Sequence, residues 1–83
     1  MKYTITLNGA AKHDIEGLTA EVQAKIIHVL REMEQNPFCG DHKKFQGSEA
    51  HRIRVGSHRI IHGVNQKSKT IQVVGIKDRR DAY

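Results

Sequence analysis

Three arginines, Arg52, Arg54 and Arg59, stand close together in the segment HRIRVGSHRIIHGV, residues 51–64. Arginine keeps its charge at any working pH and binds phosphate through two parallel hydrogen bonds. Guanidinium groups also stabilise the negative charge that develops when a phosphate is attacked. This segment therefore indicates a polyanion site, and an RNA backbone suits it.

The same segment has the pattern of a β-hairpin around the turn Gly56-Ser57, because glycine suits the first central position of a type II′ turn. Side chains alternate between the faces of a sheet, so the arginines share one face and the apolar residues Ile53, Val55, Ile60 and Val64 share the other. Opposed like charges destabilise a hairpin by up to about 1 kcal/mol, which favours an anion site; arginines that splay into water are the alternative. The predicted cross-strand pairs are Val55–His58, Arg54–Arg59, Ile53–Ile60, Arg52–Ile61 and His51–His62.

Further basic residues flank the hairpin. Residues 1–42 hold four Lys/Arg and six Asp/Glu, whereas residues 43–83 hold ten and three, so a net charge of −2 is followed by one of +7. This asymmetry is typical of a face that binds a polyanion. The additional candidates for contact with RNA are Lys43, Lys44, Lys77, Arg79 and Arg80.

RNA can be cleaved without a metal when its 2′-OH attacks the adjacent phosphate, provided that one group removes the proton and another serves the leaving oxygen. Arginine does not deprotonate in this range, so the base must be another residue. Tyr83 is one candidate, because nearby cations favour the charged form of its phenol. His51, His58 and His62 are others, but their parity places them on the predicted core side, where packing at the boundary is the favoured interpretation.

No metal or cofactor site is predicted. His51 and His62 form a predicted cross-strand pair, but no carboxylate or cysteine stands at a spacing that completes a ligand set. Cys39 is the single cysteine, so an internal disulfide is excluded, and this fits a reducing compartment. The first residues lack the pattern of a signal peptide and no stretch reaches the ~20 apolar residues of a membrane span, so we expect a cytoplasmic protein.

The elements around the hairpin can be predicted from periodicity. Alternation predicts a strand over 2–7, and Asn8 is a helix N-cap candidate before a short helix over 9–16. Thr19 is the next N-cap candidate, followed by an amphipathic helix that Pro37 ends. Residues 37–50 are expected to form a connecting loop that Phe38 and Phe45 anchor in the core, and 70–76 the last strand.

The predicted order is β-α-α-β-β-β in one domain over 1–83. An antiparallel twisted sheet, covered on one face by the two N-terminal helices, makes this an α+β fold. The other face, which carries the arginines, is expected to be open to solvent.

The segment KKFQGSEAHRIRVGSHRIIHGV and the tail KDRRDAY together resemble the RelE/ParE superfamily of bacterial toxins, specifically its RelE-like branch. The resemblance extends over nearly the whole chain, since the first strand, the two helices and the NPF segment that ends the second helix also match in order. It implies a metal-independent mRNA endoribonuclease that inhibits translation, often in the ribosomal A site, and leaves a 2′,3′-cyclic phosphate and a 5′-OH. It also implies a cognate antitoxin as partner, and leaves a homodimer open.

By position, the resemblance implies roles for six residues. Arg52, Arg54 and Arg59 would bind and stabilise the scissile phosphate, Tyr83 would act as base or orient the nucleophile, and Lys77 or Arg79 would serve the leaving group. The chain departs from the family where hairpin tyrosines are replaced by His51, His58 and His62, and where the tail histidine is Asp78. Two other functions stay open: a ParE-like inhibitor of DNA gyrase without nuclease activity, and an RNA-binding module without chemistry.

Overall fold

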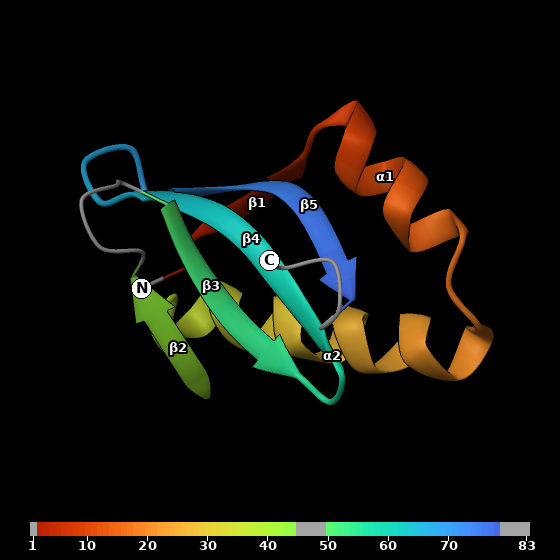
Figure 1. The fold of residues 1–83 in the computed structure, drawn as a ribbon. Helices are drawn as coiled ribbons and strands as arrows, with labels where there is room; N and C mark the ends of the chain where they lie inside the picture. Colours follow the sequence, from red (N-terminus) through yellow and green to blue (C-terminus); the bar gives the residue numbers. More distant parts are fainter. Residues whose placement is uncertain (1, 45–49, 79–83) are drawn as a thin grey trace.

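The computed structural model describes residues 2–44 and 50–78. The chain forms β1 (Thr4–Leu7), α1 (Gly9–Glu16), α2 (Ala20–Gln35), β2 (Asp41–Lys44), β3 (Ala50–Val55), β4 (His58–Asn65) and β5 (Thr70–Asp78). The strands make one sheet in the order β1-β5-β4-β3-β2. Figure 1 shows α2 running along one face of this sheet and α1 lying beside the end of β5. No helix among the described residues is both long enough and apolar enough to cross a bilayer.

Both helices begin at the predicted caps. The side chain of Asn8 accepts a hydrogen bond from Ala11 N at 2.8 Å, and Thr19 accepts one from Val22 N at 3.3 Å. Each bond satisfies one of the backbone donors that a helix leaves free in its first turn. The helix α2 buries Ile26, Leu30 and Met33, and it ends before Pro37 as expected.

The hairpin has the predicted register in full, from Val55–His58 at the turn to His51–His62. Gly56 has a φ of 61°, the sign that a type II′ turn requires at this position. Ile53 lies opposite Ile60, which lies opposite Ile76, and all three are buried in the core. The hairpin is therefore packed into the core through its apolar face, and the arginines lie on the opposite face.

Two features of the sheet differ from the predicted ones. Residues 41–44, expected in a loop, form the edge strand β2, which pairs with β3; the segment DHKK is short and charged, so its own pattern gives no strand signal and its partner decides its conformation. The strands β1 and β5 pair in parallel, whereas the remaining pairs are antiparallel as predicted.

The expected anchoring role of Phe38 is wrong. Its side chain is 41% exposed, and Pro37 takes the buried position beside it. Phe38 instead packs edge-on against the ring of His42, with 5.2 Å between centroids. Phe45, the second expected anchor, lies outside the described residues.

Candidate functional site

Strand pairing aligns the basic residues in two rows across the open face of the sheet. In one row Arg54 lies opposite Arg59, and Arg59 lies opposite Lys77. In the other row Lys43 lies opposite Arg52. Adjacent strands are about 4.8 Å apart, so the three residues of the first row span roughly 10 Å of sheet.

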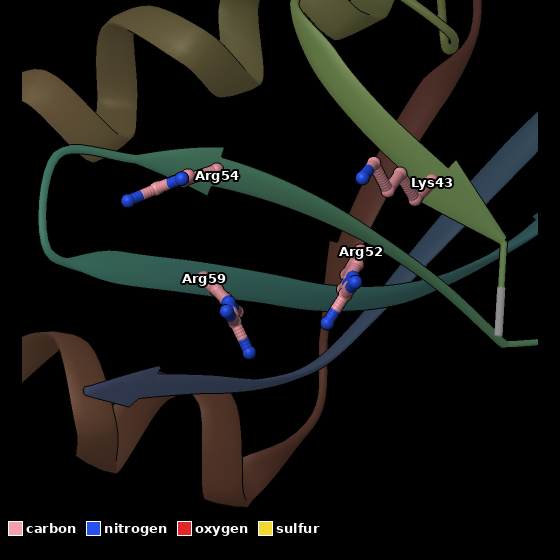
Figure 2. Close-up of a pocket in the computed structure, with 4 residues that line it drawn as sticks. All are labelled: Lys43, Arg52, Arg54 and Arg59. Atoms are coloured by element: carbon pink, nitrogen blue, oxygen red, sulfur yellow. The ribbon is translucent and has the colours of Figure 1, made fainter. Parts of the chain in front are cut away.

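Four of these side chains enclose a small pocket. Lys43, Arg52, Arg54 and Arg59 line a hollow of about 90 Å³, well above the ~10–15 Å³ that a cavity needs to hold one water molecule. Figure 2 shows Arg59 extending from β4 toward β5, while Lys43 reaches from β2 toward β3. Four positive charges around a space of this size, with guanidinium donors in a fixed fork, suit a phosphate group.

A β-bulge brings Lys77 to the same face. On β5, Val73 pairs with His62 and Gly75 pairs with Ile61, so Val74 is an extra residue without a partner on β4. Before the bulge, odd-numbered residues such as Val73 face the core; after it, Ile76 does. The extra residue thus turns Lys77 from the core face to the arginine face, as bulges beside functional sites commonly do.

The structure does not place the side chains of the remaining predicted site residues. Lys44 directly follows Lys43 in β2 and pairs with His51, whereas Lys43 pairs with Arg52. Tyr83, Arg79 and Arg80 lie outside the described residues. The structure therefore brings Lys43, Arg52, Arg54, Arg59 and Lys77 together from four strands.

Three histidines form a stacked cluster on the opposite face. The Nε2 of His42 lies 2.8 Å from Nδ1 of His51, and the rings of His51 and His62 stack with centroids 5.8 Å apart. His62 is 1% exposed, its Nδ1 lies 3.2 Å from the carbonyl of Ile60, and its Nε2 has no hydrogen-bond partner. The register thus confirms that His51 and His62 are on the core side. Within residues 2–44 and 50–78, no group of His, Cys, Asp or Glu has an arrangement that could hold a metal ion.

Burial lowers the pKa of two of these histidines, His42 and His62. Desolvation lowers the pKa of His62 to about 4, and the hydrogen bond to Ile60 offsets only part of this effect. Desolvation, followed by the charge of His51, also lowers the pKa of His42. In the unfolded chain histidine has a pKa near 6.5. Below that pH the unfolded state binds more protons than the folded state, and this favours unfolding.

We therefore expect the contribution of His42 and His62 to the stability to be nearly constant above about pH 7 and to fall as the pH decreases toward 4. His62 alone should lower the free energy of unfolding by about 2 kcal/mol between pH 7 and pH 5. Thermal unfolding followed by circular dichroism at both pH values measures this. The variant His62→Leu should show a weaker dependence, and an unchanged dependence would contradict the assignment.

The site and the fold together define a class of protein. It is a small α+β domain in which α2 packs on one face of the sheet, α1 lies beside the end of β5, and the other face presents a small cationic pocket.

Solved structures that are similar to this chain include several RelE toxins. A chain of the archaeal RelE–RelB complex from Pyrococcus horikoshii matches with a TM-score of 0.87 and 24% identity, over 99% of this chain and 100% of that chain. A chain of the RelB–RelE antitoxin–toxin complex from Methanococcus jannaschii matches with a TM-score of 0.75 and 26% identity, over 93% of this chain and 93% of that chain. An arginine-substituted variant of the Escherichia coli toxin RelE in the free state matches with a TM-score of 0.83 and 17% identity, over 99% of this chain and 88% of that chain. No protein-family model and no curated protein sequence matches the chain. The expected RelE-like fold of the RelE/ParE superfamily is confirmed.

Proposed function

We propose that this protein is the toxin of a type II toxin–antitoxin system and that it cleaves mRNA without a metal ion. The observation that carries the proposal is the pocket lined by Lys43, Arg52, Arg54 and Arg59, with Lys77 in register beside it. A polyanion is the ligand that such a face attracts, and among polyanions RNA supplies its own nucleophile in the 2′-OH.

In the proposed reaction the 2′-oxygen attacks the adjacent phosphorus while the bond to the 5′-oxygen breaks. Arg52, Arg54 and Arg59 neutralise the charge that builds on the phosphate oxygens in the transition state. Tyr83 takes the proton of the 2′-OH, and Lys77 or Arg79 serves the departing 5′-oxygen. The products are a 2′,3′-cyclic phosphate and a 5′-OH, and every bond and proton is accounted for without a metal.

The geometry favours Lys77 for the leaving group. Arginine stays protonated at working pH and is a poor proton donor, whereas an ammonium group can give up a proton. Lys77 lies directly opposite Arg59, one strand away from the pocket, so it approaches the phosphate from the β5 side.

The partners follow from the same proposal. The matched structures from Pyrococcus horikoshii and Methanococcus jannaschii are described as complexes of RelE with RelB, and we infer an antitoxin partner of that kind for this chain. The substrate is mRNA, and the ribosomal A site is the proposed place of cleavage. Bringing the message to the toxin on the ribosome would supply the orientation that a single shallow pocket cannot.

The purified protein should cleave a messenger in the presence of translating ribosomes, and a phosphorothioate at the scissile phosphate should give no cleavage that depends on an added thiophilic metal ion such as Cd²⁺. A message carrying 2′-O-methyl groups throughout one codon should resist cleavage in that codon, because the nucleophile is blocked. Products are identified by the cyclic phosphate at the new 3′ ends. Cleavage that requires a metal ion, or that proceeds at the methylated codon, would contradict the proposed mechanism.

A further inference from the structure

Lys77 is in contact with a residue of α1 that the proposed reaction does not use. Its Nζ lies 3.9 Å from Oδ2 of Asp14, whose side chain is 26% exposed. The same Oδ2 accepts a hydrogen bond from the backbone N–H of Ile76 at 2.9 Å. One carboxylate oxygen therefore contacts both the backbone just before Lys77 and the ammonium group of Lys77.

The position of Asp14 at the sheet edge explains the backbone contact. β1 pairs with β5 only as far as Leu7–Val73, so within residues 2–44 and 50–78 no strand lies beside the end of β5 on that side. Asp14 accepts from Ile76 N, where a further strand would otherwise supply a carbonyl oxygen. Figure 1 shows α1 beside this end of β5, in the place that the short β1 leaves open.

The side chains of Lys77 and Asp14 both lie next to Gly75, at the distances of ordinary van der Waals contact. A Cβ at this position would lie 3.4 Å from Cε of Lys77 and 3.5 Å from Oδ2 of Asp14. Gly75 lies opposite Ile61, in the row that begins with Lys43 and Arg52. The side chain of Lys77 thus turns back across Gly75, along the open face, instead of extending past the end of the strand.

The contact between Asp14 and Lys77 is also favourable because of the charges around it. Arg59 and Lys77 are directly opposed on β4 and β5, and like charges in that position repel. The carboxylate of Asp14 offsets this repulsion on the β5 side without entering the pocket, since Asp14 is not among the residues that line it. The ammonium group of Lys77 is thereby held at the β5 edge of the arginine face, next to Gly75.

We propose that Asp14 is a positioning residue that holds Lys77 on the arginine face for its role in RNA cleavage. This inference rests on the proposed function and adds to it a residue from α1, an element without any other part in the reaction. Asp14 contacts no RNA in this account and acts only through Lys77. Its removal should lower kcat and leave KM for the message nearly unchanged.

The test compares Asp14→Asn with the wild type in the cleavage assay and repeats the comparison in a Lys77→Ala background. Asparagine keeps an oxygen that can accept from Ile76 N but removes the negative charge, so the strand end should persist. Lys77→Ala should lower kcat by about 10²-fold and Asp14→Asn by about 10-fold. In the Lys77→Ala background, Asp14→Asn should have no further effect, because the side chain that it orients is gone.

The controls separate positioning from folding. Glu16→Gln removes an exposed carboxylate from the same helix and should leave kcat at the wild-type value. If Asp14→Asn acted by destabilising the fold, its effect would be equal in both backgrounds, which would overturn the inference. Wild-type activity in Asp14→Asn would overturn it alone, with the proposed function intact. A wild-type chain that leaves messages uncut would overturn both.

Discussion

Arg59→Ala is expected to lower the rate of RNA cleavage by about 10²–10³-fold, which is the effect of removing one donor from a site that stabilises a developing oxyanion. Arg59 has the central place on the open face, since it lies opposite Arg54 on β3 and opposite Lys77 on β5. It also lines the pocket with three other cations. Arg59→Ala therefore removes the guanidinium donor that lies between Arg54 and Lys77.

Single-turnover cleavage of a message on ribosomes measures this prediction. Arg59→Lys keeps the charge but loses the planar fork, and we expect it to recover only part of the rate. Arg31→Ala is a matched control, because Arg31 is exposed on α2 and lies away from the open face. Equal losses in Arg59→Ala and Arg31→Ala would mean that net charge, rather than this pocket, determines activity.

Ile60→Ala is expected to lower the free energy of unfolding by about 2–5 kcal/mol, the usual range for truncating a fully buried isoleucine. Ile60 is 0% exposed and lies between Ile53 and Ile76 in the register, at the centre of the core under α2. Domains of this size have about 5–15 kcal/mol in total, so a large share of the stability depends on this side chain.

Chemical denaturation followed by circular dichroism measures the loss. Ile27→Ala is the matched control, because Ile27 is the same residue type at 43% exposure, and we expect a clearly smaller effect. Arg59 and Ile60 are neighbours in sequence but face opposite sides of β4, so Arg59→Ala should impair activity at near-normal stability while Ile60→Ala impairs stability. A stable Ile60→Ala variant would contradict the placement of the core.

The hairpin could be predicted from sequence because local patterns determine it. The turn Gly56-Ser57 sets the register, and the alternation of Ile53 and Val55 with arginines sets the faces. The helix starts at Asn8 and Thr19 could be predicted for the same reason, since capping depends on side chains a few residues away.

Features that depend on distant partners could not be predicted in this way. The strand β2 follows from pairing with β3, and the parallel pair of β1 with β5 joins two strands that α1, α2 and three further strands separate along the chain. The bulge at Val74 has one trace in the sequence. The apolar residues that are buried are Ile71 and Val73, two positions apart, and then Ile76, three positions further on. The contact of Asp14 with Ile76 joins residues 62 positions apart, and no local pattern indicates it.

The central claim is that the arginine face of the sheet cleaves messages during translation. Primer extension on mRNA from cells that briefly express the wild-type chain, beside cells that express Arg59→Ala at the same level, tests it most directly. The account predicts new 5′ ends within translated codons for the wild type and none for the variant. Growth arrest with intact messages would contradict it and would direct the search to DNA gyrase, with a supercoiling assay as the next measurement.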